Sequence, residues 1–170
     1  RDSDFVHGAN ASGERYKKER IGSLCRMSES TSASLEIEAP IAEVAAKLTA
    51  IAEYPQWLTS IKKVEVVESD DQGRALKANV SVDAGVMKDR ATLSYDWSAA
   101  PAEISFSLDE ADLMTAMDGK YTLKAIDADT TMVTYQLGVE LSLPVPRMMI
   151  SKTEKSTIDQ ALKELQAQFE

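Results

Sequence analysis

The chain of 170 residues contains a single cysteine and a single histidine, and both lie near its beginning, at Cys25 and His7. The sequence after Arg26 therefore has no residue for a disulfide, for a Cys or His metal site, or for Ser-His-Asp or Cys-His catalysis. Any acid–base chemistry there must use Asp, Glu, Tyr or Lys side chains. We expect no metal and no cofactor.

Long apolar runs and an excess of positive charge are also missing. No run approaches the roughly 18 apolar residues of a membrane-spanning helix, so stable membrane insertion is not expected. The formal net charge is −9, which argues against unassisted binding to nucleic acid or anionic membranes. Apolar residues make up 44% of the chain, enough for the core of the single domain that this length predicts.

Residues 1–32 differ from the rest of the sequence. They are polar, mix both charges, show no periodicity and contain three of the seven glycines. Because they lack the apolar segment of a secretory signal peptide, we expect a cytoplasmic protein. We predict a disordered leader at 1–32 and a folded domain at 33–170. Met27 precedes a polar Ser/Thr/Glu run, and we hypothesise that the natural protein starts there.

The sequence from residue 33 predicts one strand, two helices, six strands and a long helix. The first strand is expected at 33–38, and a helix from Pro40 to about Glu53. Tyr54-Pro55 is expected to interrupt that helix, because the residue before proline avoids the helical region, and a short second helix or turn holds Trp57. Alternating apolar residues then predict strands at 61–68, 74–83, 86–97, 103–109, 114–126 and 131–143. The acidic run around Asp109, Glu110 and Asp112 is interpreted as a solvated loop.

The segment from Pro146 to Glu170 contains no further Gly or Pro, which predicts a long helix. Its second half carries an apolar stripe of Ile158, Ala161, Leu162, Leu165 and Phe169. Extended toward the N-terminus, the stripe meets Lys155, Ser151 and Met148. We interpret this mixed half as the wall of a pocket. The alternative is that Lys155 reaches water and Ser151 is tolerated in a packed core.

One-sided alternation in consecutive strands indicates an antiparallel sheet with one wet face. One long helix covers such a sheet only if the sheet curves, and a curved sheet around a single helix leaves space between them. We therefore predict an α+β helix-grip fold. It has a curved antiparallel sheet of about seven strands around the C-terminal helix, and two short helices follow the first strand. Gly119 and Gly138 are expected bending points.

Four segments occur in a characteristic order: Ala39-Pro40, Tyr54-Pro55-Gln56-Trp57, Asp118-Gly119-Lys120-Tyr121 and Leu143-Pro144-Val145-Pro146. On the basis of these four segments, the sequence from residue 34 to 170 resembles the START-like (Bet v 1-like, SRPBCC) superfamily, and within it the bacterial polyketide cyclase/dehydrase group. The resemblance implies a hydrophobic cavity between sheet and last helix, open near the first helices and some strand loops. The superfamily includes lipid carriers, hormone receptors, cyclases and quinone-binding proteins, so fold alone does not fix function.

Asp89 is unusual because it shares a strand face with the apolar residues Met87 and Ala91. It is either a polar anchor or acid–base group inside the pocket, or it reaches water at the open end of the strand. With Ser151 and Lys155 it is predicted to form a polar tip in an apolar pocket. The other ligand-binding candidates are side chains that line the cavity or form plain core: Trp57, Met87, Tyr95, Phe106, Met117, Tyr121, Tyr135 and Met148.

Three functions remain open from the sequence. The first is carriage or sequestration of a hydrophobic small molecule such as a lipid, polyketide, isoprenoid or quinone. The second is a polyketide cyclase or dehydratase in which Asp89 or a tyrosine moves protons. The third is an interaction protein whose interior is filled by side chains. No catalytic residue is assigned, and either a monomer or a homodimer is compatible with the sequence.

Overall fold

The computed structural model of the protein describes residues 30–84 and 87–170, with the backbone alone at Met87. The hypotheses about residues 1–29, including a natural start at Met27, lie outside the described residues. Thr31–Glu170 form one compact unit, and its first strand begins at Thr31, slightly before the strand predicted from Ala33.

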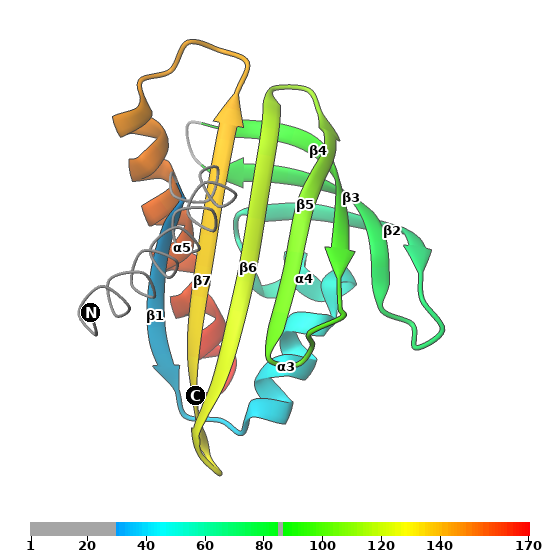
Figure 1. Ribbon diagram of the computed structural model, residues 1–170, viewed down its shortest axis with the longest axis vertical. Helices are drawn as coiled ribbons and strands as arrows, with labels where there is room; N and C mark the ends of the chain where they lie inside the picture. The colour runs from blue at the N-terminus through cyan, green and yellow to red at the C-terminus, as the bar shows by residue number, and fades with distance from the viewer. Residues whose placement is uncertain (1–29, 85–86) are drawn as a thin grey trace, which may run out of the picture. The chain divides into compact units, whose positions relative to one another are not determined.

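The order of elements confirms the predicted fold (Figure 1). The elements are β1 (Thr31–Ile37), α3 (Ile41–Thr49), the 3-10 turn η1 (Ile51–Glu53), α4 (Tyr54–Trp57), β2 (Ile61–Ser69), β3 (Ala75–Ala84), β4 (Met87–Asp96), β5 (Glu103–Ala111), β6 (Met114–Asp127), β7 (Thr130–Leu141) and α5 (Arg147–Ala167). All six predicted later strands and the long last helix are present, with ends displaced by only a few residues.

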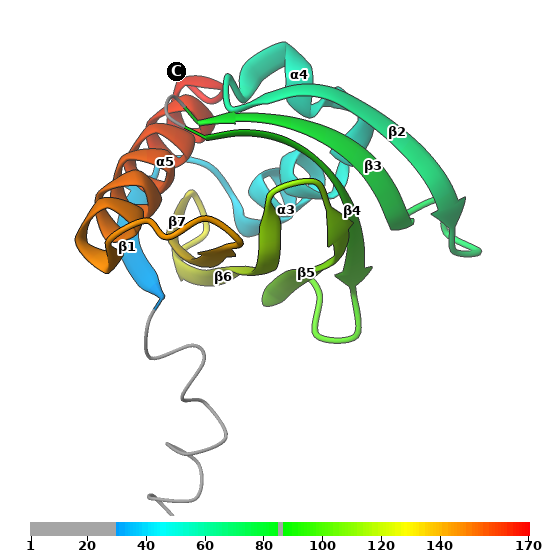
Figure 2. The ribbon, with the colours of Figure 1, turned by 90° about the horizontal axis from the view of Figure 1, so that it is seen from above.

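The seven strands form one antiparallel sheet in the order β1-β7-β6-β5-β4-β3-β2. Figure 2 shows the sheet bent into an arch, with α5 along its open side. α5 packs against β1 and β7, while α3 packs against β6 and β7, and η1 and α4 against β2. Alternate residues of the strands meet these helices in one core, whose fully buried members include Ile37, Val44, Leu48, Ile158 and Leu165.

The break in the first helical segment lies earlier than predicted. α3 ends at Thr49, and Ala50 leaves the helical region with φ −78° and ψ 70°. Tyr54 is itself helical, with φ −52° and ψ −40°, so the prediction that Tyr54-Pro55 interrupts a helix is wrong. Pro55 lies in the first turn of α4, where its missing N–H leaves no intrahelical bond unmade.

The acidic run predicted as a loop is mostly strand. β5 continues to Ala111 and includes Asp109 and Glu110. Asp109 accepts hydrogen bonds from the Ser94 hydroxyl at 2.8 Å and pairs with Lys77 at 3.2 Å. These contacts, with the Ser94 hydroxyl first, lower the pKa of the Asp109 carboxyl. Charged residues are tolerated here because they lie on the wet face of the sheet.

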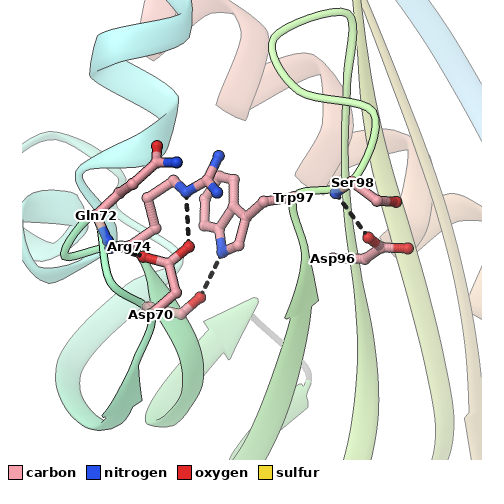
Figure 3. A network of polar contacts seen from close by, with 7 residues as sticks. Asp70, Gln72, Arg74, Asp96, Trp97 and Ser98 are labelled. Atoms are coloured by element: carbon pink, nitrogen blue, oxygen red, sulfur yellow. Dashed lines mark hydrogen bonds and ion pairs between the residues drawn. The ribbon is translucent and has the colours of Figure 1, made fainter.

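The β2–β3 turn is held by Asp70 and Arg74 (Figure 3). The Asp70 carboxylate accepts the N–H groups of Gln72 at 2.9 Å and Arg74 at 2.8 Å, and pairs with Arg74 Nε at 2.8 Å. The Arg74 guanidinium lies 5.6 Å from the centre of the Trp97 ring, and Trp97 Nε1 donates to the Ala75 carbonyl at 2.6 Å. These contacts tie the outer β2–β3 hairpin to the chain leaving β4.

Gly119 permits a close approach between strands. It is directly opposite Phe106 on β5, and a Cβ added at Gly119 would lie 2.1 Å from Phe106 Cζ. The β6–β7 register passes Gly119 and Gly138 without a shift, so neither lies at a β-bulge, and their role as bending points stays a prediction. Gly119 provides the surface on which the Phe106 ring lies.

Within residues 30–84 and 87–170, no helix has both the length and the apolar composition needed to cross a membrane.

Candidate ligand cavity

A cavity of about 200 Å³ lies between the curved sheet and α5. Every strand except β1 contributes to its wall, and α5 contributes one face. The wall is formed mostly by apolar side chains. Its residues are Tyr54, Leu58, Ser60, Ile61, Val80, Val82, Ala84, Leu93, Tyr95, Phe106, Leu113, Met117, Tyr121, Tyr135, Leu137, Val139, Leu141, Leu143, Val145, Met149, Ile150, Thr153, Glu154, Thr157 and Ala161.

The cavity opens at the end of the sheet that carries the β7–α5 loop. Leu143 and Met149 belong to the wall, yet they are 52% and 51% exposed. Tyr54, in α4, and Leu58, which follows it, also belong to the wall and are buried. The expected opening near the first helices and strand loops stays a prediction.

Four tyrosines, Tyr54, Tyr95, Tyr121 and Tyr135, belong to the wall. Tyr121 and Tyr135 are cross-strand partners on β6 and β7, and their rings stack with centres 4.2 Å apart. Tyr54 donates to the Leu48 carbonyl, and the Tyr95 ring lies between Phe106 and Trp97, with centres at 5.9 and 6.0 Å.

Burial raises the pKa of Tyr54, Tyr95, Tyr121 and Tyr135 above the ordinary phenol value, and it is the largest cause in each case. Desolvation penalises the phenolate and not the neutral phenol. All four therefore carry a proton at physiological pH, and the cavity offers neutral O–H donors.

Glu154 is the one charged residue of the wall, and the sequence interpretation missed it. It is 1% exposed. Its carboxylate accepts the Thr31 hydroxyl at 2.8 Å and the Val139 N–H at 2.8 Å, and pairs with Arg147 at 3.2 Å. Arg147 also donates to the Val139 carbonyl at 3.5 Å. Glu154 and Arg147 thus bind both backbone groups of Val139, which lies beyond the paired part of β1, where the register starts at Thr31 opposite Leu137.

A signal for Glu154 exists in the sequence. It precedes Ile158, Ala161 and Leu165 by four, seven and eleven positions, which places all four on one helix face. The sequence interpretation continued the stripe through Lys155 and did not consider Glu154.

Five predicted ligand-binding residues lie in the cavity wall: Tyr95, Phe106, Met117, Tyr121 and Tyr135. Their contact with a ligand stays a prediction. Trp57 is buried but is absent from the wall. It contacts Tyr54 edge-on at 5.2 Å and Lys47 at 6.0 Å, and its indole N–H has no hydrogen-bond partner within the described part of the chain. The side chain of Met87 lies outside the described residues.

Asp89 faces inward, but its carboxylate is occupied by the backbone. It accepts the N–H groups of Arg90 at 2.8 Å, Asp112 at 3.1 Å, Leu113 at 3.0 Å and Met114 at 2.8 Å. It is 7% exposed and is not part of the cavity wall. The predicted positions of Asp89, as a polar anchor in the pocket or as a carboxylate in water, are therefore both wrong. Asp89 holds the β5–β6 turn through its bonds to the backbone.

Lys155, Ser151 and Met148 do not reach the cavity. Lys155 is exposed and pairs with Asp159 one turn later at 2.7 Å, and Met148 is 72% exposed. Ser151 is half-buried but outside the wall. The prediction that these three face the interior is wrong because the cavity-facing side of α5 is rotated by one position, to Ile150, Glu154, Thr157 and Ala161.

The family model described as polyketide cyclase / dehydrase and lipid transport matches residues 37–166. The chain belongs to this family. In this polyketide cyclase/lipid transport family member, the matched region includes β2 to β7 completely. It also includes the last residue of β1 and all of α5 except its last residue. A search of curated proteins finds no match.

Solved structures share the fold of this family member at low sequence identity. A START superfamily protein from Mycobacterium smegmatis superimposes with a TM-score of 0.77 at 22% identity, over 82% of this chain and 96% of that one. The Zhui aromatase/cyclase from a Streptomyces species gives 0.68 at 14%, over 82% and 92%. Major latex-like protein 151 from Panax ginseng gives 0.63 at 9%, over 82% and 96%. At these identities the likeness establishes the helix-grip fold and leaves the ligand open.

Proposed function

We propose that this protein binds a hydrophobic small molecule in the cavity beneath α5 and carries or sequesters it. One observation carries the proposal: about 200 Å³ of space inside the fold, bounded mostly by apolar side chains and open beside Leu143 and Met149. Burying apolar ligand surface there yields about 25 cal/mol per Å². Family membership is consistent with such a role, since the family description includes lipid transport.

Binding is favoured over catalysis because the wall lacks a free proton acceptor. Glu154 is its one carboxylate, and both of its oxygens accept hydrogen bonds from Thr31, Val139 and Arg147. The wall includes no histidine, cysteine or lysine. A filled interior, as the interaction-protein hypothesis requires, is difficult to reconcile with the cavity.

The proposal is tested by uptake of the neutral dye 1-aminoanthracene, whose fluorescence rises in apolar surroundings. Ala161 lies in the wall on α5, so Ala161→Phe places a ring in the cavity. We expect it to weaken dye binding by about tenfold or more, because it removes volume that the dye needs. Ala167→Phe is the matched control, since Ala167 is an exposed residue of the same helix.

Equal effects of the two substitutions, or no dye uptake by the unmodified protein, would contradict binding in this cavity. Native mass spectrometry of protein extracted mildly from its own host gives an independent result. A co-purified small molecule that Ala161→Phe loses and Ala167→Phe retains supports the proposal.

A second candidate, a polyketide cyclase or dehydratase, is favoured by the stacked Tyr121–Tyr135 pair in the wall. Neutral hydroxyl donors in a dry site stabilise an oxyanion that develops on a reacting carbonyl, and a cavity that orients a chain supplies rate by positioning. The test is product formation from a polyketide chain with and without Tyr121→Phe. Unchanged product formation in that variant would remove the tyrosine pair from the reaction.

A further inference from the structure

We infer that Met149, at the opening of the cavity, is a site of reversible oxidation by peroxide, and that its sulfoxide lowers the affinity of the cavity for an apolar ligand. The effect on the ligand rests on the proposed binding function, whereas the oxidation itself does not. The support comes from the exposure of two adjacent methionines, from the place of one of them in the cavity wall, and from the polarity that one oxygen atom adds.

Met148 and Met149 lie in the first turn of α5 (Figure 1) and are the exposed methionines among the side chains that the structure describes. Met148 is 72% and Met149 51% exposed, although methionine is usually a buried residue. Met114 and Met117 are buried, and Met132 is half-buried. Oxidation of a thioether requires contact between its sulfur and the oxidant, so peroxide dissolved in water reaches the α5 pair first.

The two methionines differ in their relation to the cavity. Consecutive residues of a helix point about 100° apart, and Met149 belongs to the cavity wall while Met148 does not. The neighbours of Met149 in the chain that also belong to the wall are Leu143, Val145 and Ile150. We call these three residues and Met149 the rim. Because Leu143 and Met149 are half exposed, the rim faces both the ligand space and water, and Met148 supplies the same chemistry outside it.

The backbone that carries Met149 is held in place by other residues. The Met149 N–H donates to the Pro146 carbonyl at 3.0 Å. Arg147 pairs with Glu154 at 3.2 Å and donates to the Val139 carbonyl at 3.5 Å, which binds the start of α5 to β7. A chemical change at the Met149 sulfur therefore acts through the side chain at the rim.

Oxidation adds one oxygen atom to the Met149 sulfur. A sulfur lone pair attacks one oxygen of hydrogen peroxide, the O–O bond breaks, and the other oxygen leaves as water after proton transfer. The sulfur is oxidised by two electrons, and the peroxide is reduced by the same number. Two thiol groups of a methionine sulfoxide reductase reverse the step, since they form a disulfide and release the added oxygen as water.

The sulfoxide makes the rim less favourable for an apolar ligand. It converts a flexible apolar side chain into a polar one, and covering its oxygen with an apolar ligand removes that oxygen from water, which is unfavourable. Because Met149 is half exposed, the oxidised side chain can remain hydrated instead of covering the ligand. The ligand then loses apolar contact area, and with it part of its binding free energy.

Peptide mass spectrometry after treatment with hydrogen peroxide tests the site itself. The full chain with Cys25→Ser is used, because Cys25 is the single cysteine of the sequence and its thiol also reacts with peroxide. We expect Met148 and Met149 to gain one oxygen each at least about tenfold faster than the buried Met114 and Met117. Sulfoxide reductases for both sulfoxide epimers, with dithiothreitol, should then remove the oxygen from Met149.

Fluorescence titration with 1-aminoanthracene tests the effect on the cavity. We expect peroxide to weaken dye binding by about fivefold, and Met149→Leu to abolish this loss, because leucine has a similar volume and is not oxidised. Met148→Leu is the matched control and should lose affinity after peroxide as the unmodified protein does. Met149→Gln introduces a polar side chain of similar length without any oxidant. It should weaken dye binding by a similar factor, and Met148→Gln should not.

The outcomes separate this inference from the proposed function. No dye uptake before oxidation contradicts the binding function itself. Four results overturn the inference and leave the binding function intact: oxidation of Met149 no faster than that of Met117, a Met149 sulfoxide that the reductases do not remove, dye binding that Met149→Gln leaves unchanged, or protection by Met148→Leu in place of Met149→Leu.

Discussion

At the scale of single residues, Asp89 shows how a buried carboxylate serves the fold. Its two oxygens accept four backbone N–H groups, three of them from the β5–β6 turn at Asp112, Leu113 and Met114. The sequence indicated that the residue faces inward, because the alternation of β4 includes it. It did not indicate the acceptor role, because three of the four partners lie more than 20 positions away along the chain, and all four are backbone groups without a residue signature.

We predict that Asp89→Ala lowers the free energy of unfolding by about 3 kcal/mol, since it leaves buried N–H groups without an acceptor. Chemical denaturation monitored by circular dichroism measures the change. Asp112→Ala is the control, because the Asp112 side chain is 63% exposed and pairs with the exposed Arg90, and it should change stability by less than about 0.5 kcal/mol. Equal losses in both variants would contradict the assigned role.

Gly119 determines the position of Phe106, which belongs to the wall of the cavity. A Cβ at this position would lie 2.1 Å from Phe106 Cζ, so in Gly119→Ala the ring must move. We expect weaker binding of 1-aminoanthracene and a loss of stability of about 1–3 kcal/mol from overpacking. Fluorescence titration and denaturation measure the two effects.

The double variant Gly119→Ala/Phe106→Leu is the control for this explanation. A smaller side chain at position 106 relieves the overlap, so the double variant should be more stable than the sum of the single changes predicts. Additive effects would show that Gly119 acts through something other than the Phe106 ring.

At the scale of elements, the sequence predicted the strands well because their one-sided burial leaves a period of two in the chain. It was less successful where a helix had two possible faces. Run backward from Ile158, the stripe of α5 continues either through Lys155 or through Glu154, and hydrophobicity alone favours neither. Val139 on β7 favours the face that carries Glu154, because its N–H lies beyond the paired part of β1 and needs an acceptor. This requirement appears only in the tertiary structure.

The prediction for the first helical segment was wrong for a related reason. Proline was read as a helix breaker, but in the first turn of α4 it starts a helix. The true break is at Ala50. Its position is set by contacts such as the Tyr54 hydroxyl on the Leu48 carbonyl, which no local pattern shows.

We predict that Glu154→Ala loosens the first half of α5 from β7. The substitution leaves the buried Val139 N–H without its acceptor and the Arg147 guanidinium without its carboxylate. The Arg147 side chain is 39% exposed, so the cost of about 2 kcal/mol comes mainly from the unsatisfied N–H. Hydrogen exchange should become faster at the Val139 amide and in residues 147–153, before it does so in the second half of α5.

Glu164→Ala is the matched control on the same helix. Glu164 accepts the Thr59 N–H at 3.0 Å in an exposed position, so its loss should change stability by less than about 1 kcal/mol. A uniform increase in exchange along all of α5 in Glu154→Ala would contradict the local role of Glu154.

At the scale of the whole molecule, the net negative charge and the mostly apolar cavity are separate features. The chain carries a net charge of −9, yet the cavity wall includes only Glu154 as a charged residue. The existence of this space was inferred from the curvature that one covering helix requires. Its volume and the side chains at its opening depend on which rotamers fill the arch, and a sequence pattern does not specify them.

The four tyrosines of the wall determine how we expect the stability of the whole protein to change at alkaline pH. Their folded-state pKa values are raised by burial, so the neutral phenols favour the folded state. This stability is fully present below the ordinary tyrosine pKa of about 10, and it is lost as the pH rises above that value, because the unfolded chain then releases protons that the folded chain keeps. The protein should therefore unfold cooperatively in alkali.

This coupling is measured by the ultraviolet absorbance of tyrosinate and by far-ultraviolet circular dichroism, recorded together. A Tyr16→Phe background limits the absorbance signal to the four wall tyrosines. The two signals should change in one transition, since ionisation of these phenols requires unfolding. In denaturant the same residues should titrate near the ordinary value. Gradual ionisation near that value with unchanged circular dichroism would mean that water reaches the hydroxyls in the folded state. The cavity would then lack the dry surroundings that the proposed binding of a hydrophobic molecule requires.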